Sequence, residues 1–188
     1  MCIRDRDTGT PLVVLGAELS LRSAHGQRRI AVQDLFAGPG RTNVAPDELL
    51  IAVHVSRPPE GTGSAYVRLE YRLAMEITVV GAAALVALDA GGERIERARL
   101  ALSSVAPTIV STPEAERGLE GAPASRASFE QAGRAAAQAA RPITDVRASA
   151  DYRRAMVGVI VARVLEAAPA RARGVEVPVP ASHHHLGA

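Results

Sequence analysis

Isolated polar side chains are the first candidates for chemistry in this chain of 188 residues. Glu76 comes just before a long apolar run, where its carboxylate could hydrogen-bond a ligand at a sheet edge or could simply be the charge at the end of a strand. His25 and His54 have no acid and nucleophile arranged as in a triad, so we interpret both as solvated or hydrogen-bonded histidines. The histidines from His183 to His185 lie in a segment without periodicity, which cannot fix a coordination geometry, and we expect no metal site there.

One short glycine motif, Gly38-Pro39-Gly40, could begin a loop that lets a dinucleotide phosphate approach the backbone. It lacks the third glycine of such a loop, and Pro46 and Asp47 stand where the following helix should begin. We therefore interpret the motif as a tight turn between strands.

The composition excludes several kinds of chemistry. The printed sequence holds no lysine, which excludes a lysine Schiff base and a lysine-containing phosphate loop within it. Cys2 is its single cysteine, so it holds neither a disulfide nor the thiolates of a zinc or iron–sulfur site. With a net charge of +2 and 3% aromatic residues it offers no stacking surface for bases, and we expect no nucleic-acid partner.

The hydropathy pattern favours a chain without a membrane span. No apolar run reaches the roughly 18 residues that a spanning helix needs. The charged first residues lack the apolar segment of a secretory signal. We therefore expect a cytoplasmic location.

Three strands are predicted in the first part of the chain, at residues 11–22, 28–35 and 49–55, since apolar runs there lie between turn residues and prolines. So small a piece of sheet, with no helix of its own, buries too little surface to offset the entropy of the chain. We therefore interpret it as the end of a larger domain.

The segment from Ser64 to Ala90 is predicted to be a long strand, buried over residues 77–88, whose small residues allow a helix to approach closely. The turn residues 89–92 lead to an antiparallel partner strand. The residues predicted to be buried on that partner strand are Ala98, Leu100 and Leu102.

Three helices are predicted next: a short one beginning at Pro113, one over residues 125–140, and one capped by Ser149 that continues to Leu165. Past Pro169 the absence of periodicity predicts a loose tail. The residues of the last helix predicted to need water are Arg153, Arg154 and Arg163.

These elements predict an α+β fold, in which a remnant antiparallel β sheet of one domain precedes a small antiparallel sheet covered by about three helices. The residues alone provide no self-contained catalytic constellation.

Three runs of sequence resemble the FAD-binding medium subunit of the molybdenum hydroxylases, the family of xanthine dehydrogenase, aldehyde oxidoreductase and aerobic carbon monoxide dehydrogenase. The likeness extends over roughly residues 15 to 167, and the order and spacing of the runs make it specific. The runs are DLFAGPGRTNVAPDELLIAVHV (Asp34 to Val55), SAYVRLEYRLAMEITVVGAAALVALDAGGERIERARLALSSVAPTIV (Ser64 to Val110) and RPITDVRASADYRRAMVGVIVARVL (Arg141 to Leu165).

The resemblance implies four parts. Residues 1–9 are a non-matching, disordered start, residues 10–58 are the end of an FAD-binding domain, residues 62–167 are the flavoprotein C-terminal domain, and residues 168–188 are a flexible tail. The family's glycine-rich loops, which hold the FAD pyrophosphate, are not matched, so the resemblance implies a fragment that is inactive alone.

The resemblance also implies function. In the family, electrons from iron–sulfur clusters pass through FAD to NAD or another acceptor. The molybdenum cofactor and the 2Fe-2S clusters lie on partners, namely a large molybdenum-binding subunit and a small iron–sulfur subunit. From the other class of function, a redox-silent module that only joins subunits stays open.

Candidate flavin contacts follow from matching positions. The resemblance implies Leu50 as an apolar contact to the isoalloxazine and Ile77 near the ring face. Glu76 and Arg68 are candidates for polar contacts, although either could be an ordinary surface charge. The family usually has Asp at the position of Glu76, and the longer side chain could shift a hydrogen bond near the flavin. No catalytic acid or base is assigned, because the cofactor supplies the chemistry.

Overall fold

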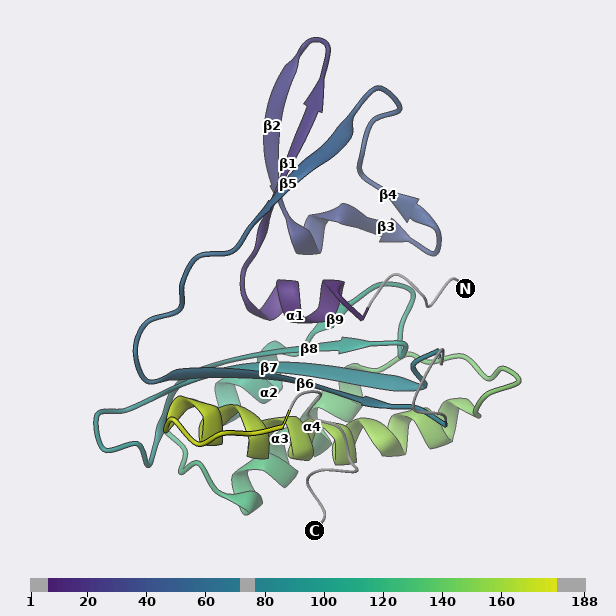
Figure 1. Ribbon diagram of the computed structural model, residues 1–188. Coiled ribbons are helices and arrows are strands. Elements are labelled where there is room, and N and C mark those ends of the chain that lie inside the picture. The colour runs from purple at the N-terminus through teal and green to yellow at the C-terminus, as the bar shows by residue number, and fades with distance from the viewer. Residues whose placement is uncertain (1–6, 72–76, 179–188) are drawn as a thin grey trace.

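The computed structural model describes residues 7–71 and 77–178, which form two lobes, one standing above the other (Figure 1). The upper lobe contains a three-stranded antiparallel sheet in the order β2-β1-β5 and a separate small hairpin. Its elements are α1 (Gly9–Val14), β1 (Glu18–Ser23), β2 (Gly26–Ala31), the 3-10 helix η1 (Val32–Leu35), β3 (Phe36–Gly38), β4 (Arg41–Thr42) and β5 (Leu49–His54).

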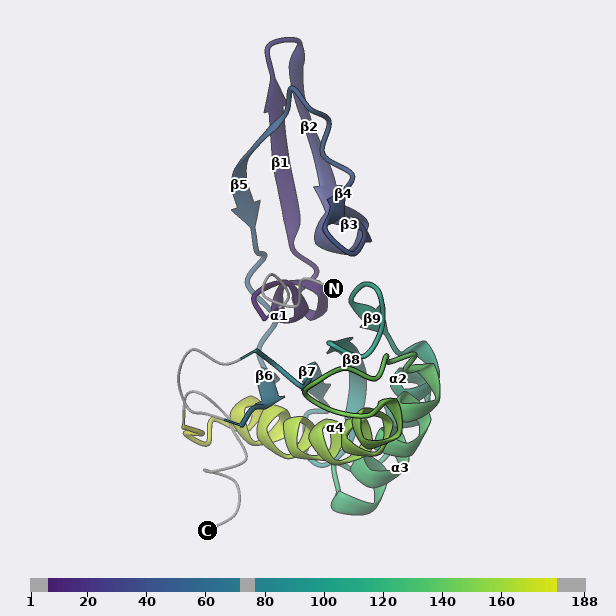
Figure 2. The same cartoon turned by 90° about the vertical axis from the view of Figure 1, so that its right-hand side faces the viewer.

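The lower lobe is an antiparallel sheet in the order β6-β7-β8-β9. The helices α2 to α4 cover one of its faces and α1 lies on the other, so the sheet is a middle layer (Figure 2). Its elements are β6 (Thr62–Leu69), β7 (Val80–Leu88), β8 (Ile95–Ser103), β9 (Val110–Ser111), α2 (Pro113–Leu119), α3 (Arg126–Ala139) and α4 (Ala150–Ala172).

Small side chains on β7 let both neighbouring layers come close. Ala82 and Ala84 belong to the large core that packs against α3 and α4, whereas Ala83 contacts α1 through Val14. Because successive side chains of a strand point to opposite faces, this alternation places a helix on each side of β7. The α+β fold is as the sequence predicts, with Ala98, Leu100 and Leu102 buried.

The prediction for residues 11–22 is wrong in its first part. Residues up to Val14 form α1, and the strand begins only at Glu18. Pro11 is compatible with the first turn of a helix, where its missing N–H has no partner to lose. Val14 gains burial against Ala83 and Ala101, and this tertiary contact overrides the strand propensity of the valines. The upper lobe therefore does have a helix of its own.

Two strand lengths are also corrected. The strand predicted for residues 28–35 ends at Ala31, where η1 begins. The segment from Ser64 to Ala90 is two antiparallel strands, with Leu69 opposite Val80. The polar residues that follow Leu69 interrupt the apolar pattern and allow the chain to reverse.

The helices confirm their predicted positions, with two exceptions in the last one. Ser149 caps α4 by accepting a hydrogen bond from the N–H of Tyr152 at 3.2 Å, but α4 continues through Pro169 to Ala172. Pro169 is buried in the core side of the helix, so packing offsets the lost backbone bond. Arg153 is not in water but fully buried.

Candidate functional site

A polar cluster joins the two lobes at the end of β6 and the start of β7. We call Asp7, Tyr66, Arg68 and Thr78 the Asp7 cluster. The Tyr66 hydroxyl and the Thr78 hydroxyl donate to Asp7 Oδ1 at 2.7 and 2.6 Å. Arg68 Nη1 donates to Asp7 Oδ2 at 2.7 Å. Asp7 precedes α1, so the cluster fixes the first turn of the upper lobe on the lower sheet.

The electrostatics of the cluster keep Asp7 and Arg68 charged and Tyr66 neutral. Burial is the main cause that raises the pKa of Tyr66 far above its ordinary value, and the negative charge of Asp7 raises it further. Arg68 also pairs with Glu70, whose Oε2 lies 2.6 Å from Nη2 and whose side chain is nearly buried. A guanidinium between two carboxylates is a fixed donor that can orient a further polar group.

The Asp7 cluster keeps hydrogen-bonding capacity for a ligand. An ionised carboxylate offers about four lone-pair positions, and a guanidinium offers about five N–H donors. Asp7 accepts three hydrogen bonds, and its side chain stays 32% exposed, against 29% for Arg68. Hydroxyl groups and an anionic or carbonyl oxygen are the ligand groups that such a donor and acceptor set accommodates, and the polar parts of FAD provide both.

The residues predicted from the family are separated in space. Arg68 belongs to the cluster, and the half-buried Ile77 adjoins Thr78 within it. Glu76 lies outside the described residues. Leu50 is on β5 of the upper lobe, opposite Leu21 and 48% exposed. β5 stands above α1 and is thereby separated from the lower sheet (Figure 1), so the structure does not bring Leu50 together with Arg68 and Ile77.

Asp7 is the member of the cluster that the sequence interpretation missed. Its three partners follow it by 59, 61 and 71 positions, so they come together only in the fold. The one local signal is an acidic residue just before the helix-compatible segment at Gly9, and a charged start to the chain conceals it.

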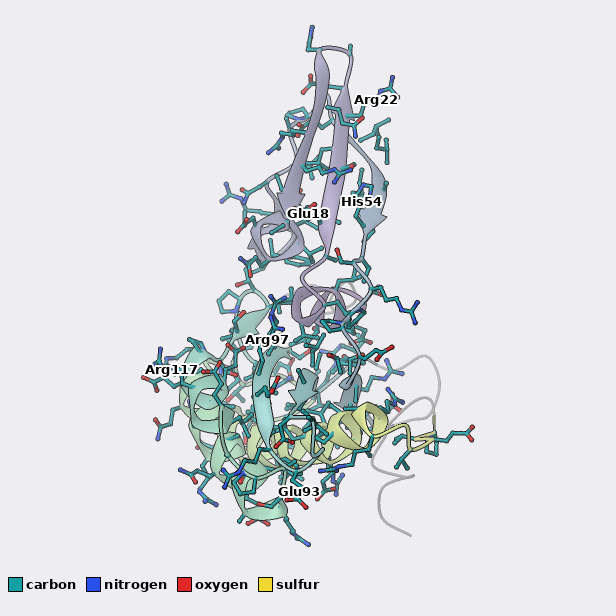
Figure 3. The ribbon with its side chains drawn as sticks, turned by 90° about the vertical axis from the view of Figure 1, so that its left-hand side faces the viewer. Glu18, Arg22, His54, Glu93, Arg97 and Arg117 are labelled. Carbon is teal, nitrogen blue, oxygen red and sulfur yellow. The ribbon has the colours of Figure 1, made fainter. Side chains whose placement is uncertain are left out.

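The histidines behave as predicted. His54 Nε2 lies 2.7 Å from the hydroxyl of Ser20, and Figure 3 shows it beside Glu18 at the lower end of the three-stranded sheet. His25 is exposed in the turn between β1 and β2. Within residues 7–71 and 77–178, no group of three or more histidine, cysteine and acidic residues could hold a metal ion. In the same ranges no helix is long and apolar enough to cross a bilayer.

A separate cavity of about 460 Å³ lies where the upper lobe meets β8, β9 and α2. Val14 and Val32 line its apolar side, and Arg99 and Glu116 line its polar side. Glu116 accepts from the N–H of Leu100 at 2.8 Å, and burial is the main cause that raises its pKa. The Asp7 cluster is built from β6 and the start of β7, so this cavity is not part of it.

Two family descriptions match the chain. The sequence model of the CO dehydrogenase flavoprotein C-terminal domain matches residues 64–168. The model of the FAD binding domain in molybdopterin dehydrogenase matches residues 2–58. The boundary between the two matches falls in the linker between β5 and β6.

Individual relatives agree with these matches. A putative xanthine dehydrogenase FAD-binding subunit of Escherichia coli K12 is 31% identical over 169 residues, which cover 89% of this chain and 57% of that protein. The carbon monoxide dehydrogenase medium chain of Afipia carboxidovorans is 35% identical over 159 residues, with 85% and 54% covered. The structure of a reconstituted CO dehydrogenase from Oligotropha carboxidovorans superposes with a TM-score of 0.81 at 31% identity, covering 88% of this chain and 57% of the other.

The chain belongs to the family of FAD-binding medium subunits of the molybdenum hydroxylases, whose two matched domains correspond to the two lobes. It spans 54% to 57% of the length of the relatives named above.

Proposed function

We propose that this chain contributes part of the flavin site of a molybdenum-containing hydroxylase, in which FAD receives electrons from iron–sulfur clusters and passes them to NAD or another acceptor. The single observation that carries the proposal is the Asp7 cluster, which lies at the junction of the two lobes that match flavoprotein domains. A large molybdenum-binding subunit and a small iron–sulfur subunit are the proposed partners, in the cytoplasm.

Each residue has a binding role in this proposal. FAD, when bound, supplies the redox chemistry, and the chain positions it. Arg68 donates to an anionic or carbonyl oxygen, Asp7 accepts from a hydroxyl, and Ile77 provides an apolar contact beside them. Leu50 stands on the other lobe, so we propose that it contacts a part of the extended cofactor remote from Arg68. Residues 10–58 and 62–167 are the proposed domain segments.

The test measures FAD binding. The chain is fused to the portion of the Escherichia coli relative that the alignment leaves uncovered, and the purified fusion is examined for bound flavin by its visible spectrum. We expect a stoichiometric flavin band in the fusion, and a band weakened by at least about tenfold in affinity when Arg68→Ala removes the fixed donor. A folded, colourless fusion would contradict the proposal.

The exposed apolar side chains of β5 are the observation that favours the alternative of a subunit-docking module without flavin. Leu50→Asp separates the two functions, because a charge placed against an apolar part of the cofactor costs desolvation energy. We expect weaker FAD binding in the fusion carrying Leu50→Asp and unchanged binding with the control Leu49→Asp, a neighbouring side chain that is 72% exposed. Equal FAD affinity in both variants would remove Leu50 from the site.

A further inference from the structure

Arg153 is a buried charge that ties three separate segments together at the start of β7. It lies on α4 and is fully buried. Its Nη1 donates to the carbonyl of Val79 at 2.6 Å and to the carbonyl of Ser104 at 3.2 Å, and its Nη2 donates to Asp145 Oδ1 at 2.7 Å. Val79 begins β7, Ser104 follows β8, and Asp145 lies in the loop before α4.

Asp145 completes this arrangement from its own loop. Its Oδ1 also accepts from the N–H groups of Arg147 and Ala148 at 2.9 and 3.2 Å. Burial alone would raise the pKa of Asp145, but these N–H groups and the Arg153 guanidinium hold it below its ordinary value. The carbonyl of Arg147 accepts from the hydroxyl of Tyr71, so the same loop also holds the chain that follows β6.

The start of β7 is thereby held from both faces of the sheet. On the α4 face, Arg153 binds the carbonyl of Val79. On the α1 face, the hydroxyl of Thr78 binds Asp7. The two residues are neighbours in the chain, so a shift of Val79 moves Thr78 within the Asp7 cluster.

We propose that Arg153 and Asp145 are a positioning pair, which fixes Thr78 and Val79 where the Asp7 cluster needs them; the inference rests on the flavin site proposed above. A guanidinium is required because its planar fork reaches three acceptors at fixed angles, which a single ammonium cannot do. Ser104 supports this assignment, since it has a φ of 65° and is the one non-glycine residue of the described ranges in the left-handed region. The bond from Arg153 to its carbonyl holds that unfavourable backbone in place.

A purely structural role gives a different expectation. Replacing both partners of a buried ion pair with uncharged residues is often neutral for stability, whereas removing one partner leaves an uncompensated charge. The double variant Arg153→Met with Asp145→Asn removes both charges and keeps the acceptor for the N–H groups of Arg147 and Ala148. We expect it to fold, but with the start of β7 released.

The experiment compares wild type, Arg153→Lys, the double variant and the control Arg154→Lys, an exposed arginine of the same helix that pairs with Asp151. Hydrogen exchange of the Val79 amide, which bonds to the carbonyl of Leu69, is followed in the chain without flavin. We expect exchange at least about tenfold faster in Arg153→Lys and the double variant, no change in the peptides of β1, β2 and β5, and no change in Arg154→Lys.

FAD affinity is measured for the same variants in the fusion, where we expect about tenfold weaker binding with Arg153→Lys. Fast exchange at Val79 in a fusion that binds no FAD at all would support the positioning pair and contradict the flavin site. Exchange unchanged at Val79, or raised equally throughout the lower lobe, would overturn the positioning pair whatever the flavin does. Fast exchange at Val79 together with wild-type FAD affinity would overturn its role in the site.

Discussion

The ion pair of Arg28 and Glu48 gives the upper lobe a sensitivity to acid. Arg28 donates from Nε and Nη2 to the two carboxylate oxygens of Glu48 at 2.6 and 2.8 Å, and the N–H of Ala45 donates to the same carboxylate at 2.8 Å. The bond from Arg28 is the largest cause, followed by that from Ala45, that lowers the pKa of Glu48 from 4.5 to about 2. A bidentate pair of this kind holds the loop before β5 against β2.

The pKa of Glu48 predicts how stability changes with pH. The folded value lies below the unfolded value, so the contribution is complete above pH 4.5 and is lost as the pH falls from 4.5 towards about 2. We expect the melting temperature of the chain to fall across this window and to fall less in Glu48→Gln, which cannot ionise. Thermal melts followed by circular dichroism measure both, and equal slopes for the two proteins would contradict the prediction.

Single residues were predictable from sequence where a family position or a local pattern identifies them. Arg68 was identified by its matched position, and His54 by its place in a strand. Asp7 and Arg153 were not, because each is defined by partners far away in the chain. An arginine on a helix is predicted to be solvated until the fold supplies Val79, Ser104 and Asp145 as acceptors.

At the scale of elements, α3 and α4 approach each other through two glycines that are not equivalent. A Cβ on Gly133 would lie 2.5 Å from the carbonyl oxygen of Gly158, whereas a Cβ on Gly158 would lie 3.7 Å from the carbonyl oxygen of Gly133. The first distance requires a backbone to move, and the second is an ordinary contact.

We therefore expect opposite results from the two alanine substitutions. Gly133→Ala should destabilise the chain by about 1–3 kcal/mol through overpacking. Gly158→Ala should leave stability unchanged or raise it by up to about 1 kcal/mol, because alanine favours a helix. Urea unfolding measures both free energies, and a loss in Gly158→Ala as large as in Gly133→Ala would show that the helices cannot adjust at either position.

Elements with a strong period were predicted well, whereas short ones were not. The apolar stripe of α4 and the Ser149 cap identify that helix without knowledge of the fold. α1 has six residues, too few for a period, and its helical state depends on the burial of Val14 against the lower sheet. The reversal between β6 and β7 was missed because the apolar content of both strands conceals the boundary between them.

At the scale of the whole molecule, the two lobes differ in how well they are packed. The large core lies entirely in the lower lobe, while β5 exposes five large apolar side chains or their neighbours. Those residues are Leu49, Leu50, Ile51, Val53 and Val55. Local opening is easiest where few apolar contacts must be broken.

Brief proteolysis with thermolysin tests this difference. The protease prefers apolar residues, so we expect the first cuts in β5, followed by a persistent fragment that contains β6 to α4. Mass spectrometry of the fragments at short times identifies the sites. Cuts in β7 as early as those in β5 would contradict the difference in local stability.

The alanines of β7 set the height at which α1 rests above the lower sheet. Ala83 carries only a methyl group towards Val14, so the distance between these two layers is close to the smallest that side chains allow. A larger residue at that position would raise α1 and, with it, the strands that follow. The tilt of the upper lobe, and hence the width of any opening between Leu50 and Arg68, is therefore adjustable through one side chain that contacts neither of them.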